Sequence, residues 1–398
     1  MVKEDAKRRQ DRGLLAVIWM FWFAMYTYPA FFAPYLRSLN ASPAEQGVII
    51  GSYGFAQMML RLPFGILSDR LGRRRIFVAA GLVASLISGF GLAFTTSLPL
   101  ILLLRGLTGV SAAMWVQLTS LYFAGIDPER RADASGHISA LQQFSTLTAM
   151  LIGSWLAERV SFPAAFALGG LAATAGLLLM LLERRRTPEE VKPAASATPA
   201  ARISWAVVAR VATDPMLFWS AVISLLMQLV QFATIQGFVP QLAADLGASP
   251  GDMGLLSALT GLSRALVSIW AGSFARRLGL RRTLVIAILL AAFCTALLPV
   301  MPNFAWLIVN QMLAALGVGL LLGLLLGLCV RDIEPQYRTS GMGFYQSVYA
   351  VGMVAGPVLT GWLAGRSTLA VAFRVIAVIA LLTALLTAWK MPKETNAR

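Results

Sequence analysis

The sequence has few charged residues, and this scarcity excludes most soluble proteins. Only 13% of its 398 residues are Asp, Glu, Lys or Arg, whereas 58% are hydrophobic. A soluble globular domain carries about 25% charged residues. The composition therefore predicts a polytopic membrane protein, with the lipid bilayer as the partner of much of its surface, and argues against an enzyme.

Cysteine, histidine and acidic residues are also scarce. The sequence has two cysteines, one histidine and 18 acidic residues. Cys294 and Cys329 fall in different apolar segments, and their spacing matches neither a disulfide framework nor a metal site. All the Asp and Glu lie in predicted loops or at the ends of apolar segments. We therefore expect no catalytic residue, no metal and no cofactor, and no carboxylate in the middle of the membrane.

Apolar runs long enough to cross a membrane follow one another along the chain. A bilayer core of about 30 Å is crossed by about 20 apolar residues in a helix. The sequence therefore predicts an all-α fold with twelve transmembrane helices. The predicted spans are 14–36, 44–67, 76–96, 99–123, 133–157, 162–182, 215–242, 251–274, 283–300, 304–329, 337–363 and 369–389.

Positive charge is concentrated on one side of this predicted topology. The formal net charge is +15, and most of the 33 Lys and Arg fall in loops on a single side. Only Arg37, Arg159 and Arg366 fall in loops on the other side. Because positively charged loops stay in the cytoplasm, both termini are predicted to be cytoplasmic. The same distribution accounts for the net charge without a nucleic-acid partner.

A very short basic loop, residues 65–75, joins the second and third predicted spans, and a second copy occurs at residues 272–282. The longer segments Leu39–Arg75 and Leu246–Arg282 align without gaps, and about a third of their residues are identical. A residue and its counterpart differ by 207 in number. A repeat of this length indicates two homologous halves.

Both copies of the repeat open with the same helix-start signal. Ser42 and Ser249 stand at predicted N-caps, a proline follows each of them, and Glu45 or Asp252 comes three residues after the serine. A serine and an acid at this spacing bond each other's backbone N–H groups at the start of a helix.

The two homologous halves are separated by a polar stretch. It includes a segment rich in Pro, Ala and Ser, at residues 193–200, which is typical of a linker. We predict an N-terminal six-helix bundle at residues 1–183, a cytoplasmic linker at residues 184–213 and a C-terminal six-helix bundle at residues 214–398.

The loop at residues 65–75 resembles the G-x-x-x-D-R-x-G-R-R signature of the major facilitator superfamily. The resemblance implies twelve helices in two pseudo-symmetric six-helix bundles, and secondary transport of a small molecule by alternating access. It also implies that the Asp of the motif meets the start of the eleventh helix and helps to close the cytoplasmic side. The motif residues, with one further acid near the arginines, are Gly65, Asp69, Arg70, Gly72, Arg73, Arg74 and Asp127.

A second resemblance concerns the fourth span. Arg105, four residues before Gly109, resembles the span-four arginine of proton-coupled members of the superfamily. It makes a proton the candidate coupling ion.

Polar and aromatic residues recur at helical spacing in several spans. Such residues face a cavity or another helix, because polar groups are costly against lipid. Gln57 and Arg61 lie four residues apart in the second span, and the repeat aligns Gln57 with Arg264 of the eighth. The predicted substrate contacts are Arg264, Arg61, Gln57, Trp22, Tyr26, Trp115, Gln228, Gln231, Tyr345 and Tyr349.

Arg264 is the deepest charge in the predicted topology. It precedes Arg276 by twelve residues, or about 18 Å along a helix that rises 1.5 Å per residue, whereas Arg61 lies nearer the cytoplasmic surface. Since no acid is predicted at the depth of Arg264, a substrate with a negative group would supply the missing charge. The favoured reading is therefore a transporter of a small organic anion.

Two alternatives remain open. The aromatic residues also fit a proton antiporter that exports amphipathic drugs, although the Gly-x-x-x-Gly-Pro pattern of drug exporters lies in span eleven, at Gly352 to Pro357, rather than in span five. The other alternative is a membrane sensor that transports nothing, which the lack of an appended domain argues against. We expect a monomer that spans the bacterial inner membrane.

Overall fold

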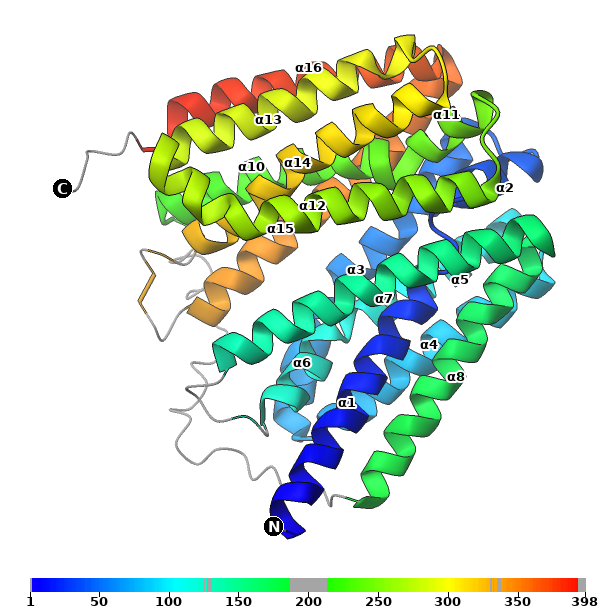
Figure 1. Cartoon of the computed structure of the whole chain (residues 1–398), viewed down its shortest axis with the longest axis vertical. Coiled ribbons are helices and arrows are strands. Elements are labelled where there is room, and N and C mark those ends of the chain that lie inside the picture. Colours follow the sequence, from blue (N-terminus) through cyan, green and yellow to red (C-terminus); the bar gives the residue numbers. More distant parts are fainter. Residues whose placement is uncertain are drawn as a thin grey trace. The chain divides into compact units, whose positions relative to one another are not determined.

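The computed structural model describes residues 2–124, 126, 131–186, 213–329, 331, 333–334 and 338–392. Within these ranges it describes the backbone but not the side chains of residues 2–12, 69, 131–133, 183–186, 322 and 338–340. All regular secondary structure in the described part is helical (Figure 1). This confirms the predicted all-α class. Most of the predicted linker lies outside the described residues.

Each predicted span corresponds to one helix or to consecutive helices. The first six spans are α1 (Val2–Tyr26) with α2 (Phe32–Ser38), α3 (Pro43–Leu71), α4 (Arg74–Phe94), α5 (Leu98–Ala113) with α6 (Trp115–Ala124), α7 (Arg131–Arg159) and α8 (Phe162–Arg186). The last six are α10 (Pro215–Ala233) with the π-helical turn η2 (Thr234–Phe238) and α11 (Val239–Asp245), α12 (Pro250–Leu278), α13 (Leu280–Leu297) with the 3₁₀ turn η3 (Leu298–Val300), α14 (Phe304–Leu328), α15 (Arg338–Arg366) and α16 (Leu369–Lys390).

Nine of these helices or helix combinations, counted in the described part of the chain, are long and apolar enough to cross a membrane. The described apolar stretch of α1, Gly13–Tyr26, is shorter. Neither α3 nor α7 is among the nine, and both carry charged residues near their ends.

The chain divides into two compact units by its internal contacts. Unit 1 comprises Met1–Tyr35, Ser52–Ala197 and Ser249–Ala258, and unit 2 comprises the rest of the chain, Leu36–Gly51, Thr198–Ala248 and Leu259–Arg398. The start of α3 therefore belongs to unit 2, and the start of α12 belongs to unit 1.

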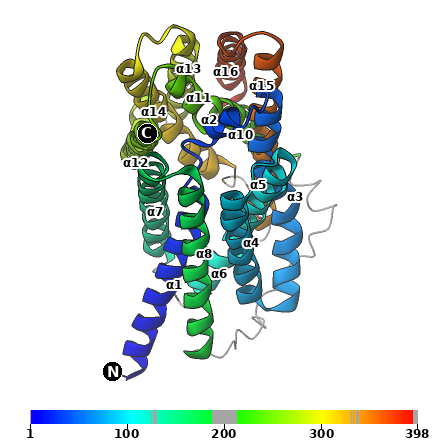
Figure 2. The ribbon, with the colours of Figure 1, turned by 90° about the vertical axis from the view of Figure 1, so that its right-hand side faces the viewer.

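The helices of each unit pack in similar pairs. In unit 1, α1 lies against α7 and α8, and α4 lies against α5 and α8 (Figure 2). In unit 2, α10 lies against α15, and α13 lies against α14 and α16 (Figure 1).

The sequence repeat reappears in the backbone. The left-handed residues of the described chain fall at equivalent places: Gly72 (φ 62°) and Gly279 (φ 87°) follow α3 and α12, whereas Asn40 (φ 60°) and Gly247 (φ 84°) follow α2 and α11. Left-handed residues end helices, and glycine or asparagine adopts them with least strain.

The predicted helix-start signals are confirmed in both copies. The backbone N–H of Ser42 donates to Glu45 at 2.8 Å, and the N–H of Glu45 donates to the Ser42 hydroxyl at 3.3 Å. The same reciprocal pair joins Ser249 and Asp252, at 3.0 and 3.1 Å. The two caps fix where α3 and α12 begin.

The first and seventh spans are both interrupted. Helix α1 ends at Tyr26 and α2 begins at Phe32, with Pro29 between them. Proline lacks a backbone donor and disfavours helix at the preceding residue. In the seventh span a π-helical turn precedes Pro240. Interrupted helices at matching places in two halves mark the region where many transporters bind their substrates.

Glycines allow several helices to approach at backbone distance. A Cβ added to Gly352 or Gly356 of α15 would lie 2.8 or 2.9 Å from a backbone nitrogen of α10, at Leu229 and Ala233 respectively. In contrast, no atom lies within 4 Å of a Cβ added to Gly323 of α14. Gly352 and Gly356 therefore bring the backbone of α15 against that of α10, whereas Gly323 has open space around it.

Candidate functional site

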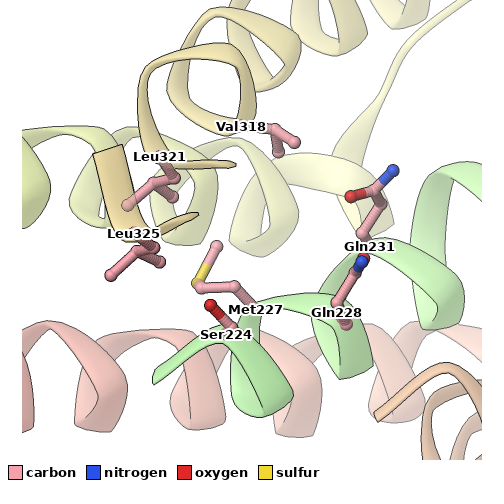
Figure 3. Close-up of a pocket in the computed structure, with 7 residues that line it drawn as sticks. All are labelled: Ser224, Met227, Gln228, Gln231, Val318, Leu321 and Leu325. Atoms are coloured by element: carbon pink, nitrogen blue, oxygen red, sulfur yellow. The ribbon is translucent and has the colours of Figure 1, made fainter. Parts of the chain in front are cut away.

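Unit 2 contains a small cavity between α10 and α14. Its lining residues are Ser224, Met227, Gln228 and Gln231 from α10, and Val318, Leu321 and Leu325 from α14 (Figure 3). The space is about the size that a single water molecule needs. The two predicted glutamines are thus brought to one cavity, together with Ser224.

One polar atom of this cavity is placed to accept a hydrogen bond from a ligand. The Oε1 atom of Gln228 is buried and has no hydrogen-bond partner among the described residues. The Ser224 hydroxyl and the Tyr345 hydroxyl lie 2.6 Å apart and bond each other. Tyr345 packs edge-on against Tyr349, with ring centroids 5.5 Å apart. A solute hydroxyl or amine could therefore donate to Gln228.

Arg264 lies in α12, in the same unit. Its side chain is half-buried, and its backbone packs against α14 at Gly319, where an added Cβ would lie 2.6 Å from the Arg264 carbonyl oxygen. Gly319 follows Val318, which lines the cavity. Arg264 is therefore level with the cavity along α14, and no Asp or Glu is among the residues that line it.

Unit 1 gathers the predicted aromatic residues into one cluster. The ring centroids of Trp22 and Trp115 are 5.0 Å apart, and those of Trp22 and Tyr26 are 5.7 Å apart. The indole Nε1 of Trp22 is buried without a hydrogen-bond acceptor in the described part of the chain. The cluster therefore combines three aromatic rings with a buried N–H group at Trp22.

The two predicted polar residues of α3 also lie in unit 1. Gln57 is 6% exposed, and its Oε1 lacks a hydrogen-bond partner among the described residues. Arg61, one turn further along, is half-buried. The structure thus collects the predicted contacts into two sets, one in each unit, with Arg264, Gln228, Gln231, Tyr345 and Tyr349 in unit 2.

Arg105 is buried among aromatic rings in unit 1. Its Nη1 donates to the Tyr28 hydroxyl at 2.9 Å, and its guanidinium carbon lies 4.7 Å from the ring centroid of Tyr53 and 5.2 Å from that of Tyr28. The Tyr28 hydroxyl also bonds Thr108 at 3.0 Å. Ring faces attract a cation most when water is excluded, so this cage can hold the charge without a carboxylate.

Sequence reasoning did not assign a role to Tyr28. It lies in the interruption between α1 and α2, next to Pro29, and it is 1% exposed. A tyrosine beside a span-breaking proline is the one local signal that could have drawn attention to it. Its partner, 77 residues later, could not be read from the sequence.

The basic motif loop is only partly described. Gly72 forms the left-handed turn between α3 and α4, and Arg70 and Arg73 are exposed while Arg74 is half-buried. A Cβ added to Gly65 would meet no atom within 4 Å. The side chain of Asp69 and the whole of Asp127 lie outside the described residues.

The whole chain matches a known family model. The model of the Major Facilitator Superfamily matches residues 14–240 and again residues 221–398. An uncharacterized MFS-type transporter of Methanocaldococcus jannaschii is 24% identical over 360 residues, which cover 87% of this chain and 90% of the relative. The inner membrane transport protein YajR of Escherichia coli is 25% identical over 374 residues, or 90% of this chain and 78% of YajR.

Other similarities are narrower or concern the fold alone. The quinolone resistance protein NorA of Staphylococcus aureus is 27% identical over 127 residues, 32% of each chain. The crystal structure of the nucleoside transporter NupG superposes with a TM-score of 0.78 at 15% identity, covering 97% of this chain and all of NupG. An inward-facing bacterial homologue of the human lysosomal transporter Spinster gives a TM-score of 0.77 at 15% identity, covering 96% of each chain.

The two matches of the family model agree with the internal repeat. Members of this family are multi-pass membrane proteins that carry small molecules. The chain belongs to the Major Facilitator Superfamily of membrane transporters.

Proposed function

We propose that this transporter moves a small organic solute with a negative group across the bacterial inner membrane by alternating access, with both termini in the cytoplasm. The observation that carries the proposal is the place of Arg264. It is half-buried in α12, level with a small cavity whose lining includes Ser224, Gln228 and Gln231 but no Asp or Glu.

The energetic reason is the cost of an arginine at this depth. A charge near the bilayer centre costs about 2.5–3.5 kcal/mol on insertion scales. A carboxylate or phosphate of the solute offsets part of this cost when it binds, and the planar guanidinium can bond it with two parallel N–H groups.

The rest of the solute would be held by hydrogen bonds. Gln228 offers a buried acceptor, and we propose Gln231, Tyr345 and Tyr349 as further contacts in unit 2. For the N-terminal half we propose the aromatic cluster of Trp22, Tyr26 and Trp115 with Gln57 and Arg61 as lining residues. These contacts would fix orientation, while Arg264 selects the charge.

The test measures transport in proteoliposomes and ligand-induced thermal stabilisation, because a ligand stabilises the state that binds it. Organic acids should stabilise the protein, and Arg264→Lys should bind them about 10-fold more weakly, the equivalent of about 1.4 kcal/mol. Arg264→Ala should remove transport. Arg374→Ala is the matched control, since Arg374 also lies within a span but is exposed on α16.

Two outcomes would contradict the proposal. One is wild-type transport of an organic acid by Arg264→Ala. The other is a thermal-shift screen in which cations stabilise the protein and acids do not.

A second candidate function is export of amphipathic drugs by proton antiport. The aromatic cluster in unit 1 favours it, because ring faces bind flat, apolar and cationic compounds. The similarity to a quinolone resistance protein over 127 residues points the same way. Arg105, held by Tyr28, would then take part in proton coupling. Stabilisation by cationic drugs, but not by acids, would favour this candidate.

A further inference from the structure

The end of α7 is hydrogen-bonded to the beginning of α12 within unit 1. One carboxylate oxygen of Glu158 accepts from the Ser249 hydroxyl at 3.1 Å and from the backbone N–H of Gly251 at 3.0 Å. Below these bonds the helices touch at backbone distance, because a Cβ added to Gly254 would lie 2.5 Å from the Ser154 Cβ. Ser154 is 0% exposed.

The Glu158 contact lies at the predicted external end of α12. Helix α12 begins at Pro250 and ends at the basic repeat of residues 272–282, so the Glu158 contact lies at the helix end opposite that basic loop. In the proposed topology this is the external end. A transporter that opens alternately to the two sides must separate its helices at this end once in every cycle.

The internal repeat has no counterpart to Glu158. The sequence Leu-Ala-Glu-Arg at residues 156–159 aligns with Leu-Ala-Gly-Arg at residues 363–366. Gly365 therefore stands where Glu158 would be, and an added Cβ there would lie 3.9 Å from the backbone nitrogen of Ala44, at the start of α3. Both repeats thus bring the end of one helix to the start of another, but only one of them places a carboxylate in the contact.

We infer that Glu158 is a one-sided external latch, which holds the start of α12 against the end of α7 and so favours the closed form of this helix pair. The free N–H groups at a helix start carry partial positive charge and bind a carboxylate. Asp252 already caps α12 from within, so Glu158 adds a bond that crosses to another helix. The latch requires no particular substrate, so it does not depend on whether the solute is an anion.

The effect of Glu158 can be measured from how often α7 and α12 separate. A Ser154→Cys probe in full-length protein in liposomes reacts with a small thiol reagent only when α7 and α12 separate. The native cysteines are both 1% exposed, and the unsubstituted chain gives their background rate. Glu158→Ala should raise the labelling rate of the probe about 2- to 5-fold, as expected for one exposed carboxylate at a helix start.

Asp252→Ala is the matched control. It removes a carboxylate from the same helix start, but that carboxylate bonds Ser249 of its own helix and does not reach α7. The Ser154→Cys probe should therefore label at the same rate with and without Asp252→Ala. Unchanged labelling in Glu158→Ala would overturn the latch, and so would an equal increase in both variants, since fraying of α12 would then explain it.

The repeat supplies a converse experiment. Gly365→Glu installs the missing carboxylate beside Ala44, and hydrogen exchange of the Ala44 amide should slow about 2- to 5-fold. Unchanged exchange at Ala44 would count against a carboxylate at this repeat position acting on the facing helix start.

Discussion

Replacing Gly352 with alanine should separate α10 from α15 and destabilise the protein. The new Cβ would lie 2.8 Å from the Leu229 nitrogen and still closer to the Leu225 carbonyl oxygen, whereas ordinary van der Waals contact begins at 3.4 Å. Both neighbours are backbone atoms, so no side chain can rotate away. The two helices must move apart by more than half an ångström, to judge from the difference between these distances.

The loss of folding stability in Gly352→Ala can be given an approximate range. Forcing an extra methyl group into a well-packed contact typically costs about 1–3 kcal/mol. The separation would also stretch the hydrogen bond between Ser224 of α10 and Tyr345 of α15, now 2.6 Å long, and disturb the cavity that α10 lines. We therefore expect lower thermal stability and weaker ligand binding in the same variant.

Gly323→Ala is the matched control for this change. It adds the same methyl group to a glycine of the same unit, in α14, with no atom within 4 Å of it. Thermal unfolding in detergent, followed by the aggregation temperature, should show a decrease for Gly352→Ala and none for Gly323→Ala. Equal stability of the two variants would refute the close approach of α10 and α15.

Three further predictions concern other parts of the chain. Asp69→Asn should slow transport while expression and ligand binding stay near normal, because a neutral amide would bind less well to the helix start that the family resemblance places opposite the motif Asp. Full transport by this variant would mean that Asp69 does not help to close the cytoplasmic side. Lys192 should react with a membrane-impermeant amine reagent only after the membrane is permeabilised, and labelling in intact cells would reverse the proposed topology. In a double-mutant cycle, Ser224→Ala and Tyr345→Phe should show a coupling energy of about 0.5–1.5 kcal/mol, and additive effects would mean that their hydrogen bond contributes nothing.

The sequence was sufficient to predict the helices and the repeat because both are local signals. Twelve apolar runs, short turns and capping serines define the spans, and Gly72 and Gly279 end their helices in the same left-handed turn. The interruption at Pro29 follows from the chemistry of proline. The predicted first span nevertheless contains two helices, α1 and α2, since hydropathy does not register a break in a continuously apolar run.

The tertiary partners could not be predicted. Nothing local in the sequence says that Arg105 meets Tyr28, or that Ser224 bonds Tyr345. The grouping of the candidate contacts into two sets, one in each unit, also depends on packing. Helical spacing gave the faces of single helices, but which faces meet is decided by shape, as where Gly319 admits the backbone of Arg264.

The exchange of helix starts between the units bears on how the chain is made. Unit 1 is completed by Ser249–Ala258, and unit 2 takes in Leu36–Gly51. While the chain is being synthesised, Ser154 and Glu158 enter the membrane long before Gly254 and Ser249 reach them. The surface of α7 around Ser154 therefore lacks its partner from α12 until α12 has been inserted. Cleavage of the chain after α8 would leave each fragment without a piece of its own packing, so the two fragments would have to be inserted together to fold.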